Sequence, residues 1–181
     1  EYWDGDISFV KIEDISGAQK YLFATKERIT RLGLKNSSAW IIPKNSVLFS
    51  MYASIGEVAI NKVPVATNQA ILGIIPNKKT TSDYLFYCLK KFGNQLAAYN
   101  IQSTQKNITL QIAKAFQVPL PSLPEQKKIV YILDSIQDAI RAQERIIEKT
   151  KELKKSLLNE IFNSKIKNKK SKLKFKIQRW I

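Results

Sequence analysis

Short apolar runs separated by polar turns dominate the first 120 residues. Residues 7–12 and 47–53 alternate as half-buried strands do, and residues 57–63 continue this pattern. Residues 70–75 form a nearly continuous apolar run, as found in a buried strand, with Gly73 as a candidate bulge. The pattern therefore predicts a sheet in the amino-terminal part of the chain.

A helical period replaces the strand pattern after residue 81. Apolar residues now recur at three- and four-residue spacing, namely Leu85, Phe86, Leu89 and Phe92. Ser82 is placed to cap this helix, and Gly93 to lie near its end. Because this helix should pack on the sheet, the sequence predicts an α+β fold for residues 1–120.

A proline-rich segment, residues 118–126, marks the next change of pattern. Its three prolines fix φ and favour extended geometry at the preceding residues, so the segment is a stiff strap. Pro124 suits a first helical turn, where Glu125 faces the positive end of the helix dipole. The helical period then continues to Phe162, which predicts a helix of about 39 residues and roughly 55–60 Å.

This long helix carries an apolar stripe wider than a two-helix zipper needs. Its predicted packing positions are Ile129, Ile132, Ile136, Ala139, Ile140, Gln143, Ile146, Ile147, Thr150, Leu153, Leu157 and Ile161. The polar residues Gln143 and Thr150 lower stability at such positions and can fix register or orientation. One small domain cannot bury so long a helix, so a second helix is the expected partner, with fold-back on its own domain as the alternative.

The charge balance favours a polyanionic partner. The net charge is +15, from 30 basic and 15 acidic residues, which suits nucleic acid better than a membrane surface. Eight basic residues and no acidic ones follow Asn163, and without them the rest carries about +7. This tail is either a solvated terminus or a phosphate- or partner-binding segment, and alternating Leu173, Phe175 and Ile177 also allow a short strand.

Several classes of function lose support from what the sequence lacks. The chain has no histidine, which excludes Ser-His-Asp and Cys-His catalysis and histidine metal sites, and its single cysteine, Cys88, excludes an intrachain disulfide. We expect Cys88 in the core. Glu13-Asp14 at a strand end and Glu125-Gln126-Lys127 at a helix start are weak nuclease candidates. The sequence predicts no catalytic or metal site, no membrane partner and, without a signal peptide, a cytoplasmic location.

Five segments together resemble one known family. The sequence PLPSLPEQKKIVYILDSI, residues 119–136, and the long helix after it look like the specificity subunit of type I restriction-modification enzymes. Residues 2–12, 42–48, 66–70 and 102–108 resemble parts of its target recognition domain. Each motif alone is weak, but their order and spacing extend the resemblance over residues 1–162.

The resemblance implies a domain plan and a set of partners. It implies a target recognition domain (1–120), a spacer and dimerisation helix (121–162) and a basic tail (163–181). The implied partners are double-stranded DNA, methyltransferase subunits and a restriction subunit. S-adenosylmethionine, ATP and Mg²⁺ are expected on those subunits, with no cofactor in this chain.

One departure from the family concerns the number of domains. Family members usually carry two recognition domains and two long helices, so the resemblance implies a half-size subunit or a fragment, with residues missing before Glu1. A half-size chain is expected to form a homodimer, with a heterodimer as the alternative, and to recognise a palindromic bipartite site. The target sequence and its spacer length are not predicted.

Polar loops supply the candidate DNA contacts, because Arg and Lys suit guanine, Asn and Gln suit adenine, and Ser and Thr suit either. The resemblance places residues 102–107 in the recognition domain, and residues 30–38 form a second basic loop, where Gly33 permits a tight turn. The candidate residues are Arg31, Lys35, Asn36, Ser37, Ser38, Ser50, Tyr52, Ser54, Gln102, Ser103, Thr104, Gln105, Lys106 and Asn107. For each group, loop capping or an ordinary half-buried strand is the alternative.

Other residues and functions complete these expectations. Asn68-Gln69 is interpreted as structural, and Trp3 and Trp40 as core.

Two rival functions are the recognition domain of a single-chain restriction-methylation enzyme and a coiled-coil adaptor that does not bind DNA. A methyltransferase box elsewhere in the complete protein would indicate the first, and DNA binding without sequence preference would favour the second.

Overall fold

The structure is a computed structural model that describes residues 1–52, 54–100 and 110–177. It contains two compact units, Glu1–Tyr131 and Ile132–Ile181. The first unit is a mixed α/β domain with two small sheets, which confirms the predicted α+β class. Within the described residues, no helix is long and apolar enough to cross a membrane.

The first sheet has the strand order β3-β1-β6. β1 (Trp3–Val10) pairs antiparallel with β3 (Glu27–Ile29) and parallel with β6 (Ala66–Thr67). Trp3 and Ile7 both lie opposite Ile29, so β1 bulges between them. The strand predicted at residues 7–12 therefore begins earlier and ends earlier, because its last residue already belongs to a helix.

The second sheet has the order β2-β5-β4-β7 and confirms three predicted strands, each shorter than expected. β4 (Val47–Ser50) pairs antiparallel with β5 (Val58–Asn61) and with β7 (Ile71–Ile74), while β2 (Tyr21–Leu22) runs parallel to β5. All residues of β4 and β5 are buried, because helices cover this sheet.

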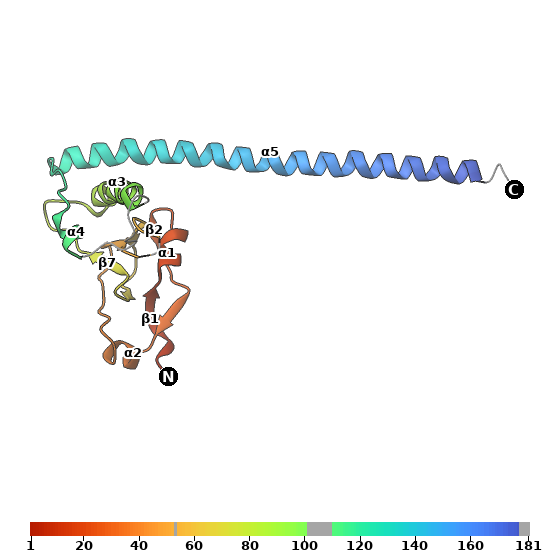
Figure 1. Cartoon of the computed structure of the whole chain (residues 1–181). Coiled ribbons are helices and arrows are strands. Elements are labelled where there is room, and N and C mark those ends of the chain that lie inside the picture. Colours follow the sequence, from red (N-terminus) through yellow and green to blue (C-terminus); the bar gives the residue numbers. More distant parts are fainter. Residues whose placement is uncertain (53, 101–109, 178–181) are drawn as a thin grey trace. The chain divides into compact units, whose positions relative to one another are not determined.

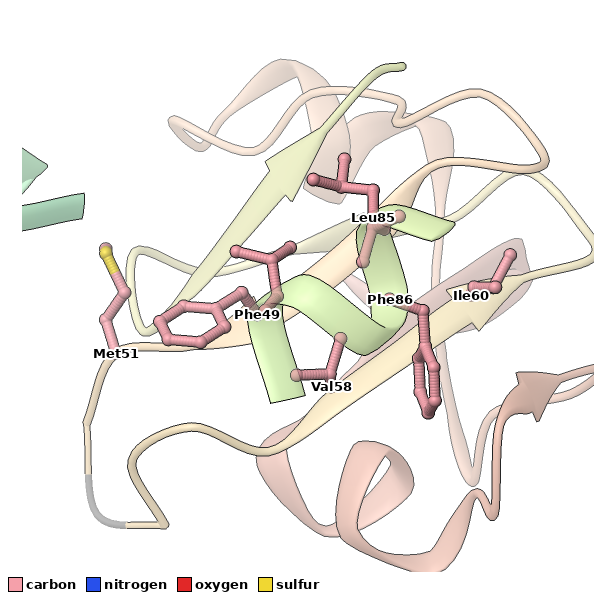
Figure 2. Packing of buried hydrophobic residues seen from close by; sticks show 8 residues of the cluster. Phe49, Met51, Val58, Ile60, Leu85 and Phe86 are labelled. Atoms are coloured by element: carbon pink, nitrogen blue, oxygen red, sulfur yellow. The ribbon is translucent and has the colours of Figure 1, made fainter. Parts of the chain in front are cut away.

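The main helix of the domain is α3 (Ser82–Asn100). Figure 2 shows its Leu85 and Phe86 among the side chains of β4 and β5 in one core cluster, which also holds Leu89. The predicted cap is wrong by one residue, because the Thr81 hydroxyl accepts the Tyr84 N–H at 3.2 Å. This helix continues well past Gly93, the residue expected near its end.

Two glycines lie where packing leaves no space for a side chain. A Cβ at Gly93 would lie 2.4 Å from the Cα of Gly56, so loop and helix backbones touch there. A Cβ at Gly73 would lie 2.6 Å from Cδ1 of Ile42. The register around Gly73 is regular, with Leu48 opposite it, so the predicted bulge is wrong and close packing accounts for this glycine.

Three short helices complete the first unit: α1 (Ile12–Gly17), α2 (Arg31–Lys35) and α4 (Leu110–Ala115). The Glu13-Asp14 pair therefore lies on a helix and not at a strand end. The buried carboxylate of Asp14 accepts the backbone N–H groups of Lys11 at 2.9 Å and Lys26 at 3.2 Å. The Asp14 carboxylate therefore links two backbone segments. This structural role removes the support for a nuclease site.

The helix α5 (Leu123–Ile177) starts where the strap predicts. Ser122 caps it: the Glu125 carboxylate accepts the Ser122 N–H at 2.8 Å and its hydroxyl at 2.7 Å, and these bonds lower the pKa of Glu125. Its end lies beyond the predicted Phe162. Residues 163–177 continue the helix, so the short strand considered for them is wrong.

Candidate nucleic-acid interface

α2 replaces the tight turn expected in the loop of residues 30–38. The Thr30 hydroxyl accepts the Gly33 N–H at 3.0 Å and caps this single helical turn, which packs on β1 and β3. Gly33 is needed for close approach, since a Cβ there would lie 2.6 Å from the Tyr2 carbonyl oxygen. α2 lies beside the amino terminus, at the end of β1 that is away from α1 (Figure 1).

The polar residues predicted on this segment are all exposed, namely Arg31, Lys35, Asn36, Ser37 and Ser38. The sequence holds no acidic residue between Glu27 and Glu57, whereas it holds four basic ones. Arg31 lies 3.9 Å from the Asp6 carboxylate, but both side chains are so exposed that this pair is weak. Arg31 and Lys35 are therefore placed to attract phosphate.

Two polar residues in this region, Ser37 and Arg28, form hydrogen bonds that stabilise the backbone. The Ser37 hydroxyl donates to the Leu34 carbonyl oxygen at 3.2 Å and accepts the Ala39 N–H at 3.3 Å, so it shapes the turn. The Arg28 guanidinium donates to the carbonyl oxygens of Gly5 at 3.0 Å and Asp6 at 2.6 Å. Arg28 therefore braces the bulged part of β1.

Large aromatic side chains near this segment are more exposed than predicted. Trp3 and Trp40 are each 50% exposed, so the prediction that both belong to the core is wrong. Trp3 lies in the exposed first part of β1, where it forms an edge-to-face contact with Phe9, with ring centroids 5.5 Å apart, and the Lys11 ammonium lies 5.7 Å from the centre of its ring. Exposed aromatic rings beside cationic residues are suited to stack on bases or sugars.

A shallow cleft of about 420 Å³ opens on the same sheet. Phe23, which is 67% exposed, and Ile41 line it together with Asp6, Ser8 and Arg28. No local sequence pattern predicts this cleft, because its walls come from four separate segments of the chain. Its Asp6 and Arg28 balance in charge, so the cleft lacks the positive field that marks a phosphate site.

The structure separates Ser50 from Tyr52 and Ser54, the other two predicted residues of this group. Ser50 is fully buried and its hydroxyl donates to the Tyr52 carbonyl oxygen at 3.0 Å, so it is wrong as a groove-facing residue. Tyr52 and Ser54 are exposed but lie beyond the end of β4. Their loop reaches α3 at Gly56, whereas α2 packs on β1 and β3, and the structure does not unite the two groups.

The third predicted group, Gln102, Ser103, Thr104, Gln105, Lys106 and Asn107, lies outside the described residues.

Asn68, interpreted as structural, accepts the Ala70 N–H at 3.0 Å through its side chain and so shapes its own turn. Cys88 is half-buried on α3 rather than fully in the core, and burial raises the pKa of its thiol. Among the described residues, no three metal-ligating side chains gather.

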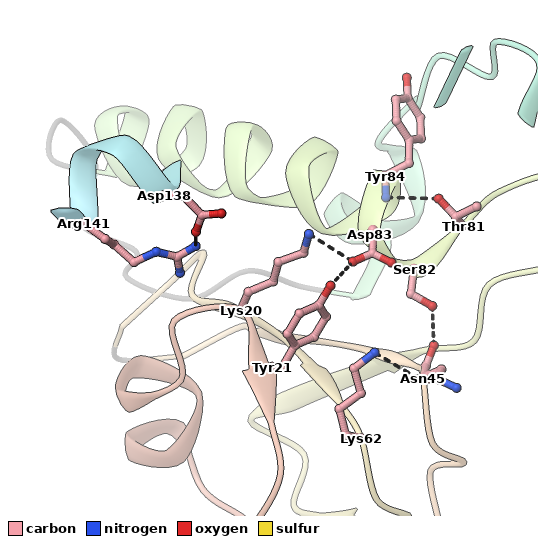
Figure 3. A network of polar contacts seen from close by, with 10 residues as sticks. All are labelled: Lys20, Tyr21, Asn45, Lys62, Thr81, Ser82, Asp83, Tyr84, Asp138 and Arg141. Atoms are coloured by element: carbon pink, nitrogen blue, oxygen red, sulfur yellow. Dashed lines mark hydrogen bonds and ion pairs between the residues drawn. The ribbon is translucent and has the colours of Figure 1, made fainter. Parts of the chain in front are cut away.

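A polar network that the sequence did not predict joins β2 to the start of α3 (Figure 3). The buried Lys20 ammonium lies 3.0 Å from Asp83, and the Tyr21 hydroxyl donates to the same carboxylate at 2.5 Å. Burial opposes the charge on Asp83, but the hydrogen bonds from Tyr21 and Lys20 outweigh it and hold its pKa below the ordinary value. Burial and Asp83 raise the pKa of Tyr21. This network connects β2 to the start of α3.

The helix stripe is exposed along its length. Ile132, Ile136 and Ile146 are each more than half exposed, and the apolar positions after them remain open as far as Phe162. The Thr150 hydroxyl donates to the Ile146 carbonyl oxygen of its own helix at 2.8 Å, and Gln143 is exposed. Their role in fixing register stays a prediction.

Comparison with known proteins identifies the class. Residues 1–152 match the model of the type I restriction modification DNA specificity domain, and the chain belongs to this family. The MjaIX specificity subunit of Methanocaldococcus jannaschii is 35% identical over 155 residues, which cover 82% of this chain and 36% of the relative. The EcoR124I/EcoR124II specificity subunit of Escherichia coli is 27% identical, over 74% of this chain and 34% of the relative.

Solved structures show the same fold. The HsdS subunit from Thermoanaerobacter tengcongensis aligns with a TM-score of 0.62 and 20% identity, over 78% of this chain and 32% of that one. A chain from a type I restriction-modification system, solved for its complex assembly and conformational transition, gives 0.67 and 20%, over 83% and 35%. The predicted family is confirmed, and with it the expectation of a DNA-specificity component rather than a catalytic one. The chain spans about a third of the length of these relatives.

Proposed function

We propose that the globular unit recognises one half of a bipartite DNA sequence. The observation that carries this proposal is the exposed, acid-free segment from Arg31 to Asn45, which presents basic, amide, hydroxyl and aromatic side chains on one connection. Arg31 and Lys35 would hold phosphates, while Asn36 and Ser38 are of the types that read base edges. The family match supports DNA as the ligand.

We further propose that α5 pairs with the same helix of a second copy. Twelve predicted stripe positions run over more than thirty residues, too many for water to cover without a large cost in free energy. A homodimer would place two recognition units on one palindromic site, with the helix pair setting the spacer. The width of the stripe leaves apolar surface for methyltransferase subunits, and through them a restriction subunit, with S-adenosylmethionine, ATP and Mg²⁺ on those partners.

DNA selection followed by substitution tests the recognition proposal. The whole chain, bound to its methyltransferase subunits, would first select a preferred sequence from random duplexes. Arg31→Ala and Lys35→Ala should then weaken all duplexes alike and reduce the salt slope by about 1 each. Asn36→Ala and Ser38→Ala should cost about 1–3 kcal/mol on the preferred site and relax a single position.

Lys91→Ala, a change of an exposed lysine on α3, is the matched control and should leave both affinity and salt slope unchanged. Equal affinity for selected and random duplexes would contradict sequence recognition and favour a coiled-coil adaptor. If Arg31→Ala, Lys35→Ala, Asn36→Ala and Ser38→Ala all kept the DNA affinity of the parent chain, the interface would have to lie elsewhere on the domain.

A further inference from the structure

One side chain of α5 differs from all its neighbours. Gln126 is fully buried, whereas the residues on both sides of it, from Leu123 to Ile129, are exposed. It lies in the first turn of the helix, and this part of α5 belongs to the globular unit Glu1–Tyr131. An amide is costly to bury unless its donors and acceptor find partners, so its position needs an explanation.

The Gln126 amide is fully engaged by two other segments. Its oxygen accepts the Thr81 N–H at 3.0 Å, and its nitrogen donates to the carbonyl oxygens of Lys79 at 2.8 Å and Pro121 at 3.0 Å. Thr81 also caps α3. One side chain therefore connects the start of α3, the strap and the start of α5.

Other hydrogen bonds join the same segments. The Tyr84 hydroxyl donates to the Pro119 carbonyl oxygen at 3.1 Å, which holds the strap on α3. Ser122 and Glu125 close the first turn of α5. An apolar side chain would also fill this space, but three hydrogen bonds require one orientation of the helix start. These hydrogen bonds therefore orient the start of α5 as well as attach it to the domain.

We propose that Gln126 is a positioning residue, which fixes the direction in which α5 leaves the globular unit. Its consequence for DNA, a sharply defined distance between half-sites, rests on the proposed function. The direction itself does not, so it can be tested without DNA. Because the helix is long, a few degrees of freedom at its first turn become several ångströms at its far end.

The test is the distribution of distances between two spin labels on the whole chain. Labels at Ser16→Cys and Glu152→Cys, both exposed positions, are introduced in a Cys88→Ala background and diluted with unlabelled chain to suppress signals between copies. The parent chain should give one narrow distribution. Gln126→Met, which keeps the volume and removes all three hydrogen bonds, should broaden it at least twofold.

Asn61→Leu is the matched control. Asn61 is also a fully buried amide, and its nitrogen donates to the carbonyl oxygens of Pro43 and Val63, each at 2.8 Å, away from the junction. This variant should lose stability yet keep the narrow distribution. An unchanged width in Gln126→Met, or equal broadening in both variants, would overturn the proposal, while a failure of DNA recognition would leave it intact.

Hydrogen exchange on the unchanged chain keeps the proposal testable if a variant does not fold. The Thr81 N–H, bonded to the Gln126 oxygen, should exchange as slowly as the amides of β4 and β5. Exchange at the rate of an exposed loop amide would mean that the junction opens freely, and the proposal would be wrong.

Discussion

The two units of this chain treat their apolar residues in opposite ways. The globular unit covers Phe49, Ile60 and Leu85 with its own strands and helices, so that each is less than a tenth exposed. The second unit leaves Ile132, Ile136 and Ile146 more than half exposed on a single helix. Exposure to water costs free energy for the apolar side chains of either unit.

The contrast separates what the chain completes alone from what it leaves to a partner. The described part of the globular unit has clusters of buried apolar residues and an ion pair with a buried lysine, as expected of a domain that folds by itself. A helix in a protein gains its stability chiefly from packing of its apolar face, which is the reason we propose a second helix as the partner of α5. Three changes to the chain test this difference between the units.

Two lysines in the stripe should have the largest effect. Ile136→Lys with Ile146→Lys places two charges in the proposed helix pair and should raise the dimer dissociation constant at least 100-fold, about 3 kcal/mol. Sedimentation equilibrium measures the change, and thermal unfolding of the globular unit should not move. Gln137→Lys with Asn159→Lys, which adds the same two charges at exposed positions away from the stripe, is the matched control.

Loss of a charge inside the globular unit should have the next largest effect. Asp83→Asn leaves the Lys20 ammonium, whose side chain is 8% exposed, without its counter-charge. The free energy of unfolding should fall by about 2 kcal/mol in urea titrations, less than for a fully buried pair, because a third of the Asp83 side chain is exposed. Glu57→Gln breaks the exposed pair with Lys90 and should cost less than about 1 kcal/mol.

The same carboxylate makes a pH prediction. The pKa of Asp83 lies below its ordinary value in the folded domain, so its contribution to stability is present above the unfolded pKa, about 3.9, and is lost as the pH falls through the folded value. The stability difference between the parent and Asp83→Asn should therefore shrink below about pH 4. A difference that stays constant down to pH 2 would contradict the pairing.

A single methyl group should have the smallest of the three effects. Gly93→Ala forces apart the backbones of α3 and the Gly56 loop and should cost about 1–2 kcal/mol, since the better helix propensity of alanine offsets part of the strain. Gly17→Ala is the matched control, because no atom lies within 4 Å of its new Cβ. Equal stability of the two variants would show that the Gly56–Gly93 contact yields easily.

Local patterns in the sequence account for much of this fold. The prolines before Gln126 and the period after it predict where α5 begins, and apolar runs predict β4, β5 and β7. These features depend on neighbours in the chain. The end of α5 was less well predicted, because a lysine-rich segment has no apolar period that favours or excludes a helix.

Contacts between distant segments explain the failures. α2 exists because Tyr2 and Thr30 hold its single turn, and no propensity predicts so short a helix. Trp3 and Trp40 resemble core residues in composition, yet each lies beside solvent in its own segment. The Asp83 network and the Gln126 junction each join residues more than forty positions apart, and no local pattern reports such a pair.

The exposed stripe of α5 is proposed to join two copies of the chain. Light scattering of the whole chain at micromolar concentration measures this association. A mass of about 41 kDa, twice the 20.7 kDa of one chain, is the predicted result. A mass of one chain, unchanged as the concentration rises tenfold, would contradict the claim.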